Sequence, residues 1–336
     1  MKILYIGNKL SKHGYNVTNI ETLGPLLSKE GFHVNYASEF ENKFLRLLDM
    51  CFKTLFFSPK KGFVIIDSYS TFGFLYLLII SQLCRILKKR YIPILHGGNL
   101  PSRLKNNPKL SKMIFGNAHI NVAPSNYLLS KFKEYNFDNV IFIPNTIEIE
   151  NYSFKNRNQF LPKLLWVRSF DKIYNPLMAV KVLKELQKNF PLSELCMVGP
   201  EKDGSLELVK KFVSENNLKV NFTGKLAKTE WLKLSENYDI FINTTHFDNT
   251  PLSVIEAMAL GLPIISTNVG GIPFLLKNNV NAILVGDNQV LEMVLAIEKL
   301  IINPEFSNTM SQNARAITQN FDWQIVKKDW FKILKN

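Results

Sequence analysis

Two acidic residues eight positions apart, Asp248 and Glu256, flank the predicted start of a helix. Thr250 suits the N-cap of that helix and Pro251 its first position. The start of a helix presents unpaired N–H groups and a positive dipole end, so it favours a diphosphate, and the carboxylates can accept hydrogen bonds from sugar hydroxyls. The alternative is a helix-capping Asp and a surface Glu.

Two cations, Arg168 and Lys172, follow a predicted strand in the segment WVRSFDKIYNP. Positive charge at a strand end can neutralise a diphosphate leaving group, whose charge grows as the glycosidic bond breaks. The alternative is a pair of solvated surface charges.

A third candidate is His96, which ends a strand in ILHGGNLP. Gly97 and Gly98 follow it and let the backbone approach a ligand closely. A single histidine is more often structural, so this motif gains its functional interpretation from the other two.

Together these motifs resemble the retaining glycosyltransferases of family 4, which have the GT-B fold of two Rossmann-like domains facing across a cleft. That family carries two acidic residues eight positions apart before a run like AMALGLP, as in this chain after Asp248 and Glu256. The resemblance covers nearly the whole chain and is densest from residue 166 to 273. The chain departs from the family pattern at Val167, Tyr174 and Phe274, and it has Asp248 where Glu is usual.

The resemblance implies roles for individual residues. Glu256 would hold the ribose hydroxyls of the nucleotide, Asp248 the transferred sugar, and Arg168 and Lys172 the pyrophosphate. His96 would donate a hydrogen bond at the reacting centre rather than act as a general base. Further donor-binding residues would be Asn249, Thr250, Pro251, Leu252, Ser253, Gly199, Gly224, Lys225 and Leu226, and the acceptor side would include Gly14, Gly97 and Gly98.

Several common motifs are absent from the sequence. There is no Asp-x-Asp, GxGxxG, GxxxxGK[ST] or HExxH motif, which disfavours metal-dependent GT-A enzymes, dehydrogenases, P-loop enzymes and zinc proteases. We therefore expect no metal and no cofactor besides the nucleotide diphosphate sugar. Cys51, Cys84 and Cys196 lie far apart among apolar neighbours, which is typical of buried thiols in a reducing cytosol.

The elements that position these motifs alternate between short apolar runs and helical patterns. Strands are predicted at residues 3–6, 33–37, 63–66, 91–95, 120–123, 140–143, 163–167, 194–198, 219–222, 240–243 and 263–266. Near-continuous apolar strands separated by helices indicate parallel sheets covered on both faces, and ligands of such sheets bind at the carboxyl ends of the strands.

The chain is long enough for two such domains. The polar segment 148–161 predicts the boundary, giving an acceptor-binding domain over 1–158 and a nucleotide-sugar-binding domain over 159–321. The amphipathic segment 322–336 is expected to pack back on the first domain. Residues 72–87 are too short and polar to span a membrane, so we predict a buried helix between two strands.

The net charge of +13 is concentrated in the first half, where residues 1–158 hold 21 Lys and Arg against 10 Asp and Glu. This excess suggests an anionic partner, such as a membrane surface, unless it only keeps the protein soluble. The segment 41–62 places apolar residues beside lysines and arginines, which favours either docking on anionic lipid or a packed core helix.

The sequence therefore predicts a cytoplasmic, metal-independent retaining glycosyltransferase, peripheral on the inner face of the cell membrane. It would move a sugar from a UDP-sugar, or alternatively a GDP-sugar, to a saccharide or lipid-linked acceptor in polysaccharide or lipopolysaccharide synthesis. The alternatives are a non-catalytic GT-B binding protein and a basic nucleic-acid-binding protein. No nucleic-acid-binding motif appears, so we expect no nucleic-acid partner.

Overall fold

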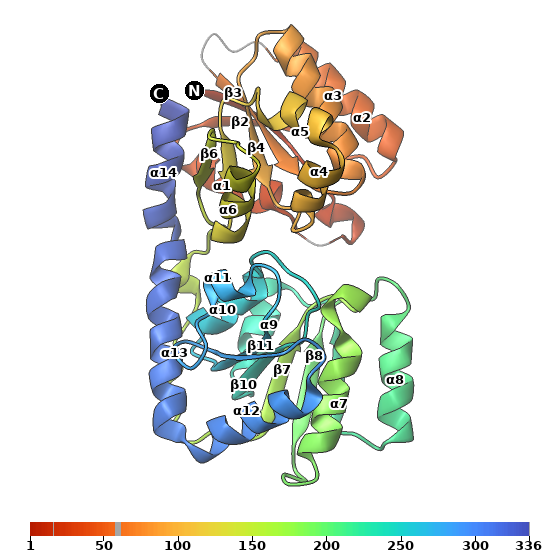
Figure 1. Cartoon of the computed structure of the whole chain (residues 1–336), viewed down its shortest axis with the longest axis vertical. Coiled ribbons are helices and arrows are strands. Elements are labelled where there is room, and N and C mark those ends of the chain that lie inside the picture. Colours follow the sequence, from red (N-terminus) through yellow and green to blue (C-terminus); the bar gives the residue numbers. More distant parts are fainter. Residues whose placement is uncertain (16, 58–61, 336) are drawn as a thin grey trace. The chain divides into compact units, whose positions relative to one another are not determined.

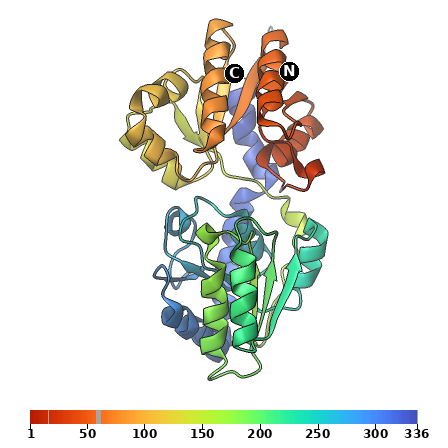
Figure 2. The same ribbon diagram turned by 90° about the vertical axis from the view of Figure 1, so that its right-hand side faces the viewer.

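A computed structural model describes the whole chain except residues 16, 58–61 and 336. Contacts divide the chain into two units, Met1–Thr146 with Trp323–Asn336, and Ile147–Asp322 (Figure 1). Each unit contains one six-stranded parallel sheet with helices on both faces (Figure 2). The two doubly wound domains expected from the alternation of strands and helices are thus present.

The first unit has the strand order β2-β1-β3-β4-β5-β6. Its strands are β1 (Lys2–Ile6), β2 (His33–Ala37), β3 (Gly62–Ser68), β4 (Tyr91–Leu95), β5 (Asn121–Ala123) and β6 (Val140–Phe142). Its helices are α1 (Asn19–Lys29), α2 (Lys43–Phe56), α3 (Phe72–Ile86), α4 (Leu100–Asn106), α5 (Pro108–Phe115), α6 (Asn126–Glu134) and α14 (Trp323–Lys335), with a 3₁₀ turn η1 (Ser11–His13).

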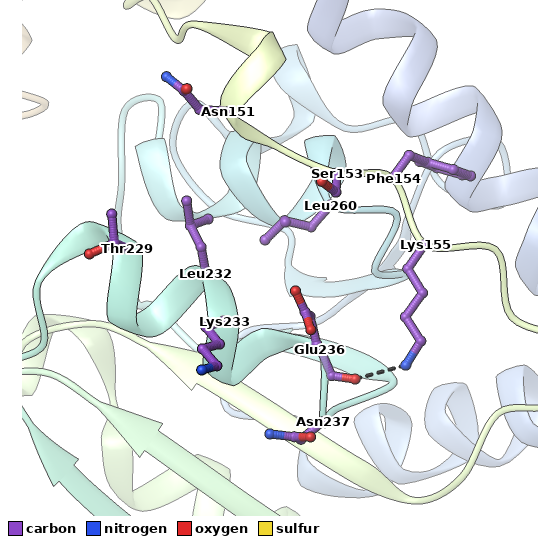
Figure 3. Close-up of a pocket in the computed structure, with 10 residues that line it drawn as sticks. All are labelled: Asn151, Ser153, Phe154, Lys155, Thr229, Leu232, Lys233, Glu236, Asn237 and Leu260. Carbon is purple, nitrogen blue, oxygen red and sulfur yellow. Dashed lines mark hydrogen bonds between the residues drawn. The ribbon is translucent and has the colours of Figure 1, made fainter.

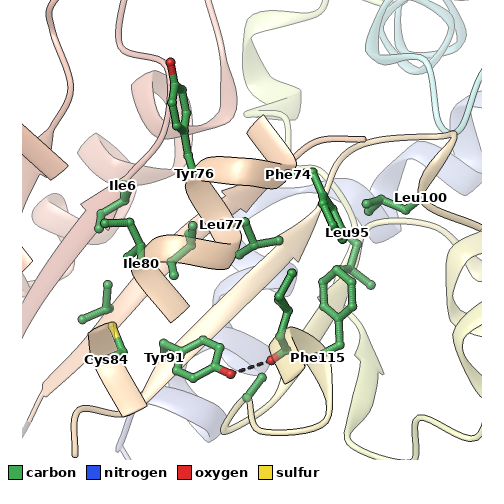
Figure 4. Packing of buried hydrophobic residues seen from close by; sticks show 14 of the residues in the cluster. Ile6, Phe74, Tyr76, Leu77, Ile80, Cys84, Tyr91, Leu95, Leu100 and Phe115 are labelled. Atoms are coloured by element: carbon green, nitrogen blue, oxygen red, sulfur yellow. Dashed lines mark hydrogen bonds between the residues drawn. The ribbon is translucent and has the colours of Figure 1, made fainter. Parts of the chain in front are cut away.

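Two apolar cores cover the two faces of this sheet. Helices α2 to α6 pack on one face, and Figure 4 shows the centre of that core around Leu77 and Phe115. Helices α1 and α14 pack on the other face, where Trp323 and Trp330 of α14 are buried.

The second unit has the strand order β12-β11-β10-β7-β8-β9. Its strands are β7 (Lys163–Val167), β8 (Glu194–Val198), β9 (Val220–Gly224), β10 (Ile240–Asn243), β11 (Ile264–Thr267) and β12 (Ile283–Val285). Its helices are α7 (Pro176–Leu186), α8 (Ser205–Glu215), α9 (Lys228–Ser235), α10 (Leu252–Ala259), α11 (Ile272–Leu275), α12 (Val290–Ile302) and α13 (Pro304–Thr318), with 3₁₀ turns η2 (Ile149–Asn151), η3 (Lys172–Tyr174) and η4 (Gln319–Phe321). Strand β12 was not predicted.

The segment expected to link the domains is instead built into the second unit. Residues 147–158, predicted to lie in the first domain, belong to Ile147–Asp322. Arg157 is buried there and donates from Nε to Asp239 Oδ1 at 3.0 Å and to the carbonyls of Tyr238 and Gly261. A polar composition suggested a solvated linker, but here the charge is buried because it is paired and hydrogen-bonded.

Helix α3 also differs from its expectation. The segment is helical and lies between two strands, but Phe72, Leu75 and Ile86 are exposed along one face. Among the described residues, no helix is long and apolar enough to cross a bilayer. Cys84 and Cys196 are buried as expected, and burial raises the pKa of the Cys84 thiol to about 12, whereas Cys51 is only half-buried on α2.

Candidate active site

The second sheet reverses its strand order between β7 and β10, and the motifs rich in charge follow these two strands. Loops at such a switch point commonly form the ligand site of a doubly wound domain. Arg168, directly after β7, forms an ion pair through Nη2 with Asp248 Oδ2, in the loop after β10. The Arg168 guanidinium also lies over the ring of Tyr174 at 4.7 Å. The structure therefore brings the two motifs together.

Backbone contacts join the same two loops. The His246 N–H donates to the Ile173 carbonyl at 2.8 Å, and Thr245 Oγ1 donates to it at 3.0 Å. Lys172 is exposed in this loop, and its backbone N–H donates to Asp203 Oδ2 at 3.0 Å. The backbone that carries the Lys172 side chain is therefore fixed by hydrogen bonds to Asp203 and to the loop after β10.

Glu256 is buried in α10 rather than exposed, so the alternative of a surface Glu is wrong. Its Oε1 accepts a hydrogen bond from the Tyr152 hydroxyl at 2.8 Å and forms an ion pair with Lys228 Nζ at 3.1 Å. Burial, followed by the charge of Glu256, raises the pKa of Tyr152, so its hydroxyl keeps its proton and donates. Neither Tyr152 nor Lys228 was predicted, since each lies outside the motif that contains Glu256.

The start of α10 is one residue later than expected. Pro251, with ψ of 118°, occupies the N-cap position, and Thr250 does not cap the helix. The prediction of a Thr250 N-cap is therefore wrong, because the extended Pro251 shifts the first helical residue to Leu252. In the first turn, Ser253 Oγ is buried without a hydrogen-bond partner among the described residues. Such an oxygen suits a polar ligand atom at this helix end.

A glycine loop approaches the residues before α10. Asn249 is buried, and a Cβ on Gly271 would lie 1.9 Å from the Asn249 carbonyl oxygen. The Gly271 N–H donates to the Asp248 carbonyl at 2.8 Å, while Asp248 Oδ1 accepts from the Asn249 N–H at 2.7 Å. Only glycine fits at position 271, and the contacts fix the backbone at Asp248 and Asn249.

Two further glycines end β8 and β9 beside Arg168. Gly199 has a φ of +150°, and a Cβ there would lie 1.8 Å from the Arg168 carbonyl oxygen. Its N–H donates to the Gly224 carbonyl at 2.9 Å. After Gly224, Lys225 is exposed and Leu226 packs against the core under α9 and α10. The expected donor-binding glycines thus lie together at one edge of the sheet, and their binding roles remain predictions.

In the first unit, His96 directly follows β4 and is hydrogen-bonded to a carboxylate that was not predicted as a site residue. His96 Nε2 lies 3.0 Å from Oδ1 of Asp67, the buried penultimate residue of β3. The same Oδ1 accepts from the Tyr5 hydroxyl at 3.0 Å, and the His96 ring stacks on Tyr69 at 5.7 Å. Burial, followed by the Asp67 charge, raises the pKa of Tyr5, which keeps its hydroxyl protonated.

The buried Asp67 carboxylate is hydrogen-bonded through only one of its two oxygens among the described residues. Its Oδ2 has no hydrogen-bond partner among the described residues, and a Cβ on Gly7 would lie 2.5 Å from it. Strands β1 and β3 pair where the strand order of this sheet reverses, so Asp67 lies at the switch point of the first unit. The only signal in the sequence was a lone acid ending an apolar strand.

The three glycines predicted on the acceptor side lie in different structural settings. A Cβ on Gly97 would lie 2.7 Å from the Ser70 N, so the backbone passes close beside β3 at this point. Gly98 is half-buried before α4. Gly14 caps η1 with a φ of +84°, and nothing lies within 4 Å of its ideal Cβ.

A pocket of about 650 Å³ lies elsewhere in the second unit. It is lined by residues around α9 that include Lys155, Lys233 and Glu236 (Figure 3), and it contains none of the predicted site residues. Lys155 Nζ donates to the Glu236 carbonyl across it at 2.7 Å. Among the residues that the structure describes, no group of three His, Cys, Asp or Glu side chains is placed to hold a metal.

Comparisons with known proteins agree with this geometry. The chain is 29% identical over 210 residues to an uncharacterized glycosyltransferase of Haemophilus influenzae, covering 60% of this chain and 57% of that one. It is 25% identical over 201 residues to the Escherichia coli UDP-Gal:alpha-D-GlcNAc-diphosphoundecaprenol alpha-1,3-galactosyltransferase, covering 55% of this chain and 51% of that one. The chain thus spans little more than half the length of these relatives.

The structure of Anabaena HepE in complex with UDP and glucose superposes on this one with a TM-score of 0.79 at 16% identity, over 100% of both chains. This similarity shows that the two doubly wound units form a GT-B fold. The family model described as "Glycosyl transferases group 1" matches residues 148–317, half of the chain, including every motif found after β7 and β10. The chain therefore belongs to the glycosyl transferases group 1 family.

Proposed function

We propose that this chain is a glycosyltransferase that moves a sugar, with retention and without a metal, from a nucleotide diphosphate sugar to a saccharide or lipid-linked acceptor. A UDP-sugar is the favoured donor and a GDP-sugar the alternative. The acceptor belongs to cell-surface polysaccharide or lipopolysaccharide synthesis at the inner face of the cell membrane. The observation that carries the proposal is the Arg168–Asp248 ion pair at the switch point, in the same unit as the buried Glu256.

The donor's diphosphate is held by positive charge. Arg168, Lys172 and the N–H groups at the start of α10 stabilise the charge that develops on the departing diphosphate. Glu256, already oriented by Tyr152 and Lys228, accepts hydrogen bonds from the ribose. Asp248 holds Arg168 in place and keeps lone pairs for a sugar hydroxyl, since each of its oxygens has one protein donor.

The transfer step exchanges one bond at the anomeric carbon for another. The bond to the diphosphate oxygen breaks, and the acceptor oxygen bonds to the same face of the sugar. The acceptor proton passes to the departing diphosphate, so no protein base is required. His96, oriented by Asp67, donates a hydrogen bond to the transferred sugar.

The named relatives support the choice of ligands. HepE binds UDP and glucose, and the E. coli galactosyltransferase is named for a UDP-sugar donor and an acceptor linked to diphosphoundecaprenol. Both names fit a UDP-sugar donor, and the second fits a lipid-linked acceptor.

A panel of UDP- and GDP-sugars tests the proposal through donor binding, donor hydrolysis and transfer. We expect one donor to be turned over, and Glu256→Gln to weaken its binding roughly tenfold. Glu207→Gln, on the exposed side of α8, is the matched control and should bind as wild type. NMR of the product should show the donor's α configuration.

The outcomes separate the alternatives. Tight donor binding without hydrolysis or transfer would favour the non-catalytic binding protein. Binding to none of the nucleotide sugars would contradict the proposal itself.

A further inference from the structure

Helix α2 turns its apolar side away from the core of the first unit. Six large apolar side chains are exposed along it, between 48% and 71% each: Phe44, Leu45, Leu48, Phe52, Leu55 and Phe56. Their spacing places them on one face. The residues that α2 buries are instead Arg46, Met50 and Thr54. The structure thus shows a helix that packs on the core through Met50, Leu47 and Cys51 while it exposes six large apolar side chains on its other side.

Hydrogen bonds fix the rotation of α2. Arg46 donates from Nε to the Phe40 carbonyl at 2.7 Å, from Nη1 to Asn8 Oδ1 at 3.0 Å and from Nη2 to the Glu41 carbonyl at 2.8 Å. Turning the apolar side of the helix inward would carry Arg46 out to solvent and leave the Asn8 side chain and the Phe40 and Glu41 carbonyls without their donor. The outward apolar face is therefore a stable feature of the unit.

Helix α3 packs beside α2 and extends the same surface. Phe72, Leu75 and Ile86 are exposed on it, and Lys43 of α2 lies over the Phe72 ring at 4.4 Å. We name these exposed residues of α2 and α3 the α2–α3 apolar face. Contiguous apolar surface of this kind marks an interaction site.

The charge beside the α3 part of the α2–α3 apolar face is basic, whereas the α2 part also carries Asp49 and follows the exposed Glu39 and Glu41. Residues 68–133, which contain α3, α4, α5 and most of α6, carry ten Lys and Arg and no Asp or Glu. Exposed cations there include Arg85, Lys105, Lys109 and Lys112. The first unit holds 23 Lys and Arg against 9 Asp and Glu, a net +14, whereas the second holds 18 against 19, a net −1. Lys60 and Lys61, part of the predicted basic segment, lie outside the described residues.

We propose that the α2–α3 apolar face docks the first unit on a bilayer containing anionic lipid. Aromatic and aliphatic side chains enter the boundary between headgroups and acyl chains, and the surrounding cations attract the negative leaflet. A protein partner would need only the apolar surface, whereas the acid-free basic stretch beside it matches a negatively charged plane. The inference deepens the proposed function, because it names the surface that brings the enzyme to a lipid-linked acceptor.

Co-sedimentation of the full chain with vesicles tests this inference. We expect binding to phosphatidylcholine vesicles that contain phosphatidylglycerol, weakened by high salt, and little binding to phosphatidylcholine alone. The variant F44S/F52S/F56S should lose roughly a hundredfold in vesicle binding. The matched control L208S/L291S/L295S removes equally exposed apolar side chains from α8 and α12 and should bind as wild type.

A second pair of variants isolates the charge. K105Q/K109Q/K112Q should lower binding to the anionic vesicles about fivefold for each lysine removed. K181Q/K233Q/K277Q, at exposed positions of the second unit, should leave binding unchanged. Circular dichroism should show that all four variants are folded, since every substituted side chain is exposed.

Three results would overturn the docking surface: no wild-type binding to anionic vesicles, undiminished binding by F44S/F52S/F56S, or a wild-type dimer that this variant dissociates. The last result would assign the face to a second copy of the chain. Donor hydrolysis measured without vesicles keeps the two proposals apart. If the protein binds vesicles but does not hydrolyse the donor, only the glycosyltransferase proposal is contradicted. If it hydrolyses the donor but does not bind vesicles, only the docking surface is contradicted.

Discussion

At the scale of single residues, Lys172 is the cation whose removal should affect catalysis with the least structural cost. Its side chain is exposed, while its backbone N–H is tied to Asp203. Lys172→Ala should lower turnover about 100- to 1,000-fold, the usual effect of removing one group that stabilises transition-state charge. Its thermal midpoint should stay near that of wild type.

Steady-state kinetics with the preferred donor checks this expectation. Lys181→Ala, at an exposed position of α7, serves as the control for loss of a positive charge. Turnover of Lys172→Ala equal to that of Lys181→Ala would remove Lys172 from the site.

Asp67 acts through His96, so it is a positioning residue. Its buried Oδ2 has no partner, and burying an unpaired carboxylate oxygen costs stability. Asp67→Asn keeps the shape and removes the charge. We expect kcat to fall about tenfold or more because the His96 ring loses its anionic partner, with an unchanged KM for the donor and an unchanged or higher thermal midpoint.

The split between kcat and thermal midpoint distinguishes this role from a structural one. A purely structural Asp67 would give a lower midpoint with unchanged kcat in the folded fraction. That result would exclude the positioning role.

At the scale of elements, the pairing of α14 with α1 predicts a pH dependence. Glu30, just after α1, accepts from Lys327 Nζ at 2.9 Å and from Trp323 Nε1 at 3.1 Å, and these bonds lower its pKa from 4.5. A lowered carboxyl pKa stabilises the folded protein above the unfolded value. That contribution disappears as the pH falls through the folded pKa.

Glu30→Gln should therefore destabilise the first unit by about 1 kcal/mol or less at neutral pH, and the difference from wild type should vanish in acid. Urea unfolding followed by fluorescence of Trp323 and Trp330 checks this. Glu134→Gln, which removes the exposed partner of Lys131, should have no effect at either pH. A difference that persists below the folded pKa would contradict the assignment to the ion pair.

The elements also show what the sequence could predict. Periodicity located eleven of the twelve strands to within two residues, because buried parallel strands are near-continuous apolar runs. Strand β12 was missed although the sequence AILV at 282–285 is an apolar run, and it is as short as β5 and β6. The stripe on α2 was visible too, but periodicity cannot tell which side faces the core. Here the hydrogen bonds of Arg46 determine it.

For the site, sequence reasoning found residues that belong to local motifs and missed those that reach them from elsewhere. Arg168 and Asp248 each lie in a recognisable segment. Tyr152 lies 104 positions before Glu256, and its segment lacks any helical or strand pattern. A contact at that separation depends on the fold of the whole unit. Asp67 was missed for the same reason, 29 positions from His96.

At the scale of the whole molecule, every residue assigned to the nucleotide diphosphate of the donor falls in Ile147–Asp322. The two ends of this unit meet, since the Ile147 N–H donates to the Phe321 carbonyl at 2.9 Å and the Ile149 N–H to Asp322 Oδ2 at 3.0 Å. A compact unit whose ends lie together and which has its own core can fold alone. We therefore expect the fragment 147–322 to fold and to bind the donor's nucleotide within about tenfold of the full chain.

The fragment 159–322, cut at the boundary that the sequence alone suggested, provides the matched comparison. It lacks Arg157, whose loss leaves Asp239 as a buried charge without its ion-pair partner, at a cost of about 3–5 kcal/mol. It also lacks Tyr152, which orients Glu256. We expect 159–322 to be unfolded or to bind UDP at least tenfold more weakly than 147–322 by calorimetry. Equal stability and equal affinity of the two fragments would show that residues 147–158 are a linker and that the Tyr152–Glu256 contact has no part in holding the nucleotide.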